Sequence, residues 1–222
     1  MEQTFMQKIA GYKPIHVAAE MGFKDIVEFY LDRERSADVN AVSIFGSTPL
    51  HLAAGNDFKD IVGMLLHNGA YYNALDGFNL TPLQLSKENC ISTLLRIVEE
   101  LFSAVEKNDY FMLENEIKVG FNYSKYCFAN AKCLKNETLL HFASKNGCEE
   151  IVVILLKQKI NPNTRDPNKY TPLHYAAKSS HFNVVKSLLM NGAVYNALSH
   201  NQETALDIAV GKRNYQYVTF RK

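Results

Sequence analysis

Residues 48–54 have the sequence TPLHLAA, and residues 171–177 repeat it almost unchanged as TPLHYAA. Weaker copies bring the total to six, and the copies start at residues 13, 48, 81, 138, 171 and 204. Three of the five steps between these starts are 33 residues long, while one is 35 and one is 57. A period of this length indicates an array of similar units that stack on their neighbours.

A second, apolar stretch follows four of these copies. It carries Val, Ile and Leu at helical spacing and lies at residues 26–31, 61–66, 151–156 and 184–189. One unit alone has no partner for such a stripe, so neighbouring units must bury it between them. In the first stretch, Thr suits a helix N-cap and Pro suits the first helical turn. Gly69 and Gly192 follow the second stretch, where a left-handed residue commonly ends a helix.

The TPLHxA stretch and its 33-residue period resemble the ankyrin repeat, over nearly the whole chain. The resemblance implies an all-α solenoid of helix–turn–helix units, each followed by a β-hairpin finger. We expect one domain over residues 1–222, with about six to seven repeats and an irregular middle. The expected units span approximately residues 1–45, 46–78, 79–98, 99–135, 136–168, 169–201 and 202–222.

The 57-residue step is expected to hold two units. The third unit starts normally but has no finger, and its second helix, at about 92–98, runs toward a first helix of the fourth unit at 101–105. Residues 110–119 would form the second helix of that unit. A longer finger follows, and such insertions often lie on the binding face of a repeat array. A neutral surface insertion is the alternative, because loop entropy grows slowly with length.

Seven histidines raise the question of catalysis or metal binding. Four of them occupy the fourth place of the repeated stretch, namely His16, His51, His141 and His174. The resemblance implies that these imidazoles bond finger backbone and link successive units, and that His181 has a structural role in an inter-helix turn. It also implies that four asparagines bridge finger backbone, namely Asn40, Asn73, Asn163 and Asn196. His200, at a finger tip, is the histidine that we expect to be available to a partner.

Other features of the sequence argue against an enzyme. No nucleophile elbow, P-loop or dinucleotide-binding glycine pattern is present, so no cofactor or small-molecule substrate is expected. The four cysteines form no CxxC pair, which disfavours a metal site and favours reduced thiols in a cytoplasmic protein; a Cys127–Cys133 disulfide is the alternative. The net charge of +1 argues against nucleic acid as a partner. No apolar run reaches the ~18–20 residues that a membrane span needs.

The expected function is to bind another protein through the concave face and the finger tips. Apolar side chains on two adjacent fingers suggest a binding patch, although they could instead pack between the fingers. Farther along the chain the surface becomes basic, so a partner with an apolar anchor and an acidic stretch would match. The candidate partner-binding residues are Ile44, Phe45, Phe78, Leu80, Tyr126, Phe128, Lys145, Asn168, Tyr170, Lys178 and His200.

A second function remains open at this point. The irregular repeats also resemble those of bacterial ankyrin effectors and of the latrotoxin-like proteins of arthropods. That resemblance implies that the array is the targeting arm of a larger effector or toxin. An effector of this kind would act in the cytoplasm of a host cell.

Overall fold

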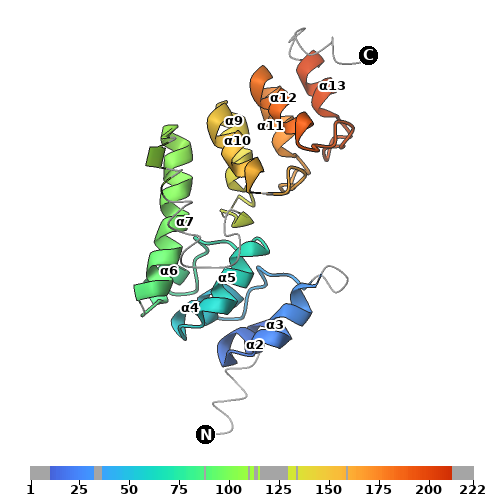
Figure 1. The fold of residues 1–222 in the computed structure, drawn as a ribbon. Helices are drawn as coiled ribbons and strands as arrows, with labels where there is room; N and C mark the ends of the chain where they lie inside the picture. The colour runs from blue at the N-terminus through green and yellow to red at the C-terminus, as the bar shows by residue number, and fades with distance from the viewer. Residues whose placement is uncertain are drawn as a thin grey trace, which may run out of the picture. The chain divides into compact units, whose positions relative to one another are not determined.

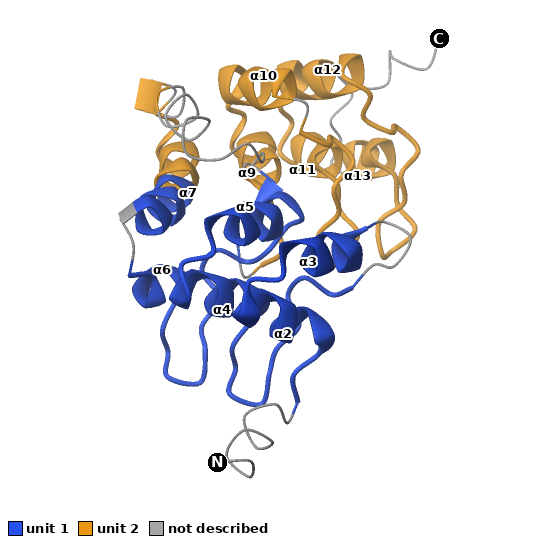
Figure 2. Ribbon diagram, turned by 60° about the horizontal axis from the view of Figure 1, so that its bottom comes forward, with its two compact units in different colours: residues 1–99, 118–134 blue, residues 100–117, 135–222 orange. Residues whose placement is uncertain are grey.

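The computed structural model describes residues 11–32, 37–87, 89–109, 111–112, 115, 130–133, 135–158 and 160–211. The chain forms two compact units (Figure 2). Unit 1 comprises residues 1–99 and 118–134, and unit 2 comprises residues 100–117 and 135–222. The candidate residues Tyr126 and Phe128, with most of the expected helix at 110–119 and the long finger, lie outside the described residues.

The described helices of unit 1 form two rows (Figure 1). The first row consists of the helices that directly follow the fingers or the start of the array: α2 (Pro14–Met21), α4 (Pro49–Gly55) and α6 (Pro82–Leu85). The second row consists of α3 (Lys24–Leu31) and α5 (Lys59–His67). Neighbouring helices pack on each other along both rows, and within a repeat α2 packs on α3 and α4 on α5.

Unit 2 repeats this arrangement. Its first row consists of α9 (Leu139–Asn146), α11 (Pro172–Lys178) and α13 (Ala205–Gly211). Its second row consists of α10 (Glu149–Lys157) and α12 (Phe182–Met190). Figure 2 shows the two rows as separate layers in this unit. The helical, sheet-free architecture of the described residues confirms the expected all-α class, with helix pairs stacked in each unit.

The repeated stretch starts helices as its residue types predict. Thr occupies the N-cap of α4, α6, α9 and α11, and Pro follows it in three of these four helices. The paired alanines are buried, which lets neighbouring first-row helices approach closely; they are Ala18, Ala19, Ala53, Ala54, Ala176 and Ala177. Gly69 and Gly192 have φ of 86° and 87°, so both have the left-handed conformation expected after a helix.

The middle of the chain departs from the regular repeat. Helix α6 has only 4 residues, and α7 (Asn89–Lys107) is a single helix of 19 residues. It joins the two helices expected at 92–98 and 101–105. No Gly or Pro interrupts residues 89–107, and apolar side chains at helical spacing are buried along its length, so nothing in the sequence ends the helix between them. The expected unit boundaries in this region stay a prediction.

The fingers are tight turns. In each, the N–H of the first residue donates to the carbonyl of the fifth at 2.9–3.0 Å, and the pairs are Ser43–Ser47, Asp76–Leu80, Asp166–Tyr170 and Ser199–Glu203. Neighbouring fingers within a unit also bond each other: Gly77 N–H donates to the Phe45 carbonyl, and His200 N–H donates to the Asn168 carbonyl, both at 2.8 Å. These bonds hold the finger backbones without a β-ladder in the described residues.

The repeated histidines link each helix to the next finger, as expected. His51 Nδ1 accepts from the Thr48 N–H at 3.1 Å, so Nε2 carries the hydrogen and donates to the Leu80 carbonyl at 3.0 Å. The same Nε2 bond joins His16 to Ala41, His141 to Tyr170 and His174 to Glu203. His181 Nε2 lies 3.1 Å from the Lys145 carbonyl, which confirms its structural role.

Two of the four asparagines bridge loops as expected. The Asn40 amide donates to the Gly69 carbonyl at 3.0 Å and accepts from the Tyr71 N–H at 2.7 Å. Asn163 repeats this arrangement with Gly192 and Val194. For Asn73 and Asn196 the bridging role stays a prediction. Cys133 and Cys148 are buried free thiols, which removes the disulfide alternative.

Gly147→Ala is expected to lower the free energy of unfolding of unit 2 by about 2–4 kcal/mol. Gly147 has φ of 77°, and a Cβ there would lie 2.5 Å from Nδ1 of His181. Gly192→Ala is the matched control, because Gly192 has φ of 87° but no atom near its Cβ position. Urea denaturation measures both losses. Equal losses for the two variants would show that the His181 ring does not restrict this position.

Candidate functional site

The first candidate surface lies on the two bonded fingers of unit 1. The side chain of Phe78 is 76% exposed, that of Ile44 60% and that of Phe45 45%, whereas Leu80 is half-buried. Exposure on this scale exceeds what core residues show, so the rings contribute little to the packing of the array. Large apolar side chains gathered on an exposed surface commonly mark a binding site.

Two further members of this patch were missed in the sequence. Val42 is 59% exposed and Leu75 is 51% exposed. Each follows a buried alanine at the same place in successive repeats, just before a finger begins. That shared register is the signal that could have identified them. We call Val42, Ile44, Phe45, Leu75 and Phe78 the finger patch.

One residue of the finger patch, Ile44, also packs against the backbone of its own unit. A Cβ added to Gly11 would lie 2.4 Å from Cγ2 of Ile44, so this methyl group covers the Gly11 backbone. The two fingers are also joined through their main chains. Their backbones are joined by the bond from Gly77 N–H to the Phe45 carbonyl, and a Cβ on Gly77 would lie 2.7 Å from that carbonyl oxygen.

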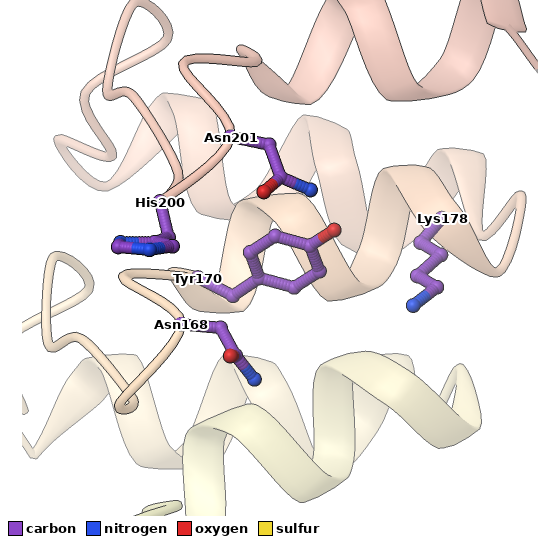
Figure 3. Close-up of a pocket in the computed structure, with 5 residues that line it drawn as sticks. All are labelled: Asn168, Tyr170, Lys178, His200 and Asn201. Atoms are coloured by element: carbon purple, nitrogen blue, oxygen red, sulfur yellow. The ribbon is translucent and has the colours of Figure 1, made fainter.

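The second candidate surface is a hollow of about 130 Å³ in unit 2, lined by Asn168, Tyr170, Lys178, His200 and Asn201. Four of these five residues are among the candidates taken from the sequence. Figure 3 shows Asn168 and Asn201, from adjacent finger tips, on either side of the Tyr170 ring, with Lys178 beyond its hydroxyl end. The bond from His200 N–H to the Asn168 carbonyl fixes the two tips relative to each other.

The Tyr170 ring is held on two sides. It stacks on His174 with a centroid distance of 5.3 Å, and the Lys178 ammonium lies 5.3 Å from the ring centroid. Burial, followed by the charges of Glu203 and Asp166, raises the pKa of Tyr170, so the phenol stays protonated and remains a donor. The hollow therefore presents a cation and several hydrogen-bond donors to its contents.

Below this surface, one phenol joins two buried carboxylates. The Tyr175 hydroxyl oxygen lies 2.7 Å from Oε1 of Glu137 and 2.8 Å from Oδ2 of Asp166, so the two carboxylates share its single hydrogen. Burial and these two bonds raise the pKa of Tyr175 well above its usual value. The candidate Lys145 is exposed, and its ammonium lies 6.0 Å from the centroid of the Tyr175 ring. This link between two fingers and α11 was not foreseen from the sequence.

Tyr175→Phe is expected to lower the free energy of unfolding of unit 2 by about 1–3 kcal/mol. The substitution keeps the ring but leaves the buried Glu137 and Asp166 carboxylates without their shared donor. Tyr195→Phe is the control, since Tyr195 is 73% exposed and should change stability by less than about 0.5 kcal/mol. Urea titration followed by circular dichroism compares the two, and equal stabilities would mean that the phenol bridge contributes nothing.

One surface offers apolar rings and the other offers a cation with neutral donors, and no nucleophile paired with a base lies in either. The described residues include no group of three or more His, Cys, Asp or Glu side chains placed to hold a metal ion. Within the same residues, no helix is both long enough and apolar enough to cross a membrane.

Stacked helix pairs with bonded finger turns define a repeat-array protein, and comparison with known proteins identifies its class. The family model for ankyrin repeats (three copies) matches residues 2–76 and 75–199. The chain therefore belongs to the ankyrin-repeat family. Ankyrin repeats generally mediate protein–protein interaction, and the family typically supplies non-enzymatic scaffolds.

Three relatives show how far the similarity extends. Human Rabankyrin-5 is 30% identical over 198 residues, which cover 88% of this chain and 15% of that protein. Alpha-latrocrustotoxin-Lt1a of Latrodectus tredecimguttatus is 33% identical over 117 residues, which cover 52% of this chain and 8% of the toxin. Bovine ankyrin repeat domain-containing protein 49 is 39% identical over 64 residues, covering 29% of this chain and 27% of that protein. The chain thus spans only a small part of each of these relatives.

Proposed function

We propose that the chain is a protein-interaction scaffold that holds a partner through the finger patch of unit 1. The observation that carries the proposal is the exposure of Phe78 and Phe45 on fingers whose backbones are already bonded together. A partner that covers these rings removes apolar area from water without reorganising the array. Rigid aromatic anchors of this kind supply much of the affinity at protein interfaces.

Site-specific photo-crosslinking in a native lysate tests this proposal. Benzoylphenylalanine in place of Phe78 or Val42 is expected to crosslink to the same protein. The control position is Met190 on α12, which is 77% exposed but lies on a second-row helix. A crosslinked protein that is shared by the two finger positions and absent from the control supports the scaffold. The same products at all three positions, or none at the fingers, would exclude the finger patch as the site.

A second candidate function is that the array is the targeting arm of a larger effector or toxin. The similarity to the spider latrocrustotoxin, of which the chain covers 8%, favours this reading. Under this proposal the array selects the target, while a neighbouring domain acts on it. The complete coding sequence decides: a catalytic or pore-forming domain beside the repeats supports the effector, and an open reading frame with repeats alone contradicts it.

A further inference from the structure

Around α9 and α11 of unit 2, the charged side chains are sorted by depth. In residues 135–146 and 165–178, every exposed charged side chain is positive: Lys135, Lys145, Arg165, Lys169 and Lys178. The two acidic residues in these ranges, Glu137 and Asp166, are both only 6% exposed. The overall charge of +1 hides this local excess of positive charge.

The Tyr175 phenol accounts for the sorting. Its single hydrogen is shared between the two buried carboxylates, and Asp166 also accepts from the Tyr170 N–H at 2.7 Å. These carboxylates are thereby turned inward and satisfied within the protein. The lysines beside them keep their ammonium groups at the surface, so the exposed charge on this part of unit 2 is positive.

The hollow beside these lysines presents donors. Lys178 contributes an ammonium group, Tyr170 a hydroxyl, and Asn168 and Asn201 side-chain amides, and His200 contributes a ring nitrogen (Figure 3). No carboxylate lines it. Glu203, half-buried on the neighbouring finger, acts on Tyr170 together with the buried Asp166.

We propose that this face of unit 2 binds an acidic peptide segment of a partner protein, with one Asp or Glu carboxylate in the hollow. The inference deepens the proposed scaffold function, because it assigns a partner chemistry to a second surface of the same chain. Lys145 and Lys178 lie in the last turns of equivalent helices of successive repeats, so the cations recur at the spacing of one repeat. A run of carboxylates on an extended peptide meets these cations in turn.

A peptide carboxylate fits this surface better than a nucleic acid does. Binding of single strands relies on aromatic rings with open faces on which bases stack. The Tyr170 ring already stacks on His174, and the Lys178 ammonium lies over it. The Tyr175 ring packs against His141 in a T-shaped arrangement, with a centroid distance of 5.7 Å. The hollow of about 130 Å³ also has room for a side chain and little more.

The test is fluorescence anisotropy with a labelled peptide of alternating Glu and Ser residues, at low and at physiological salt. A peptide with Gln in place of Glu is the matched probe. The Glu peptide is expected to bind at least about tenfold more tightly than the Gln peptide, and Lys178→Glu and Lys145→Glu should each weaken its binding about tenfold. Glu203→Gln should tighten it, because a like charge beside the hollow is removed.

Lys186→Glu on α12 controls for net charge, since Lys186 is exposed on a second-row helix and the charge change is identical. It should alter the dissociation constant by less than about twofold. An equal loss in Lys186→Glu and Lys178→Glu would overturn the proposal, and so would the absence of binding up to about 1 mM peptide. Tighter binding of a labelled single-stranded dT oligonucleotide, or of the same peptide with phosphoserine, would also overturn it.

The test separates this inference from the scaffold proposal. The Phe45→Ala/Phe78→Ala variant lacks two rings of the finger patch but retains every residue of the unit 2 hollow. It should bind the Glu peptide as the wild type does, whatever the crosslinking experiment shows. Unfolding midpoints of all variants, read by circular dichroism, exclude loss of the fold as the cause of weaker binding.

Discussion

Leu65→Ala and Leu188→Ala are each expected to lower the free energy of unfolding by about 2–5 kcal/mol. Both leucines are 0% exposed; Leu65 lies on α5 in unit 1 and Leu188 on α12 in unit 2. Truncation removes apolar contacts and leaves a cavity between helices that neighbouring repeats close only in part. Urea denaturation followed by circular dichroism measures the loss, and each variant reports on its own unit.

Phe45→Ala and Phe78→Ala are the comparison for these core variants. Their rings are exposed, so each substitution should change stability by less than about 1 kcal/mol. If they act as anchors, each should weaken partner binding by about 1–3 kcal/mol. Losses of stability as large as those of Leu65→Ala would show that the rings pack between the fingers, and the finger patch would then be part of the core.

Stability is expected to fall steeply as the pH drops from about 7 to 5, because buried neutral histidines must take up protons on unfolding. Burial lowers the pKa of His16, His51 and His174, and it outweighs the backbone bonds that act in the opposite direction. A lowered pKa in the folded state means that stability is complete above the unfolded pKa of about 6.5. Below it, each histidine costs up to about 1.4 kcal/mol per pH unit.

His51→Gln is the control for this pH dependence. In the third repeat, Gln84 replaces the histidine, and its Oε1 accepts from the Thr81 N–H at 2.8 Å. Glutamine at position 51 can therefore keep the helix cap while it removes the titrating group. Urea denaturation across the pH range should show a shallower pH dependence for unit 1 in the variant. An unchanged slope would mean that His51 does not contribute to acid sensitivity.

Much of the fold follows from the repeated stretch, because its residues have local roles. Thr48 and Pro49 start a helix wherever they recur, and the histidine three residues after the Thr links that helix to the next finger. The spacing of these roles sets the length of the repeat. The family assignment rests on the same residues, which are those that every unit needs in order to stack.

What could not be foreseen depends on contacts between unlike residues. Tyr175 occupies a place where other units have Val, Leu, Phe or Ile. Its link to Glu137 and Asp166 exists only because two fingers meet α11 there. Helix α7 is likewise continuous because its sequence contains no residue that ends a helix. The repeat pattern is faint there, and a missing stop signal is harder to notice than a motif that is present. The repeated motif contains the residues that all units share, so a contact that occurs in a single unit leaves no trace in it.

The candidate surfaces illustrate the same limit. Register along the repeat placed Asn168, Tyr170, Lys178 and His200 on one face, and they do line one hollow. Register could not tell that Leu80 is half-buried while Phe78 is 76% exposed, because exposure depends on how each finger meets its neighbour.

Affinity capture from a native lysate tests the central claim most directly, with the wild-type chain and the Phe45→Ala/Phe78→Ala variant immobilised side by side. Leu188→Ala, which perturbs the core of unit 2, serves as the control for reduced stability. The scaffold account predicts that mass spectrometry finds at least one protein retained by the wild type and by Leu188→Ala but lost from the double variant. Identical sets of retained proteins on the wild type and the double variant would contradict it.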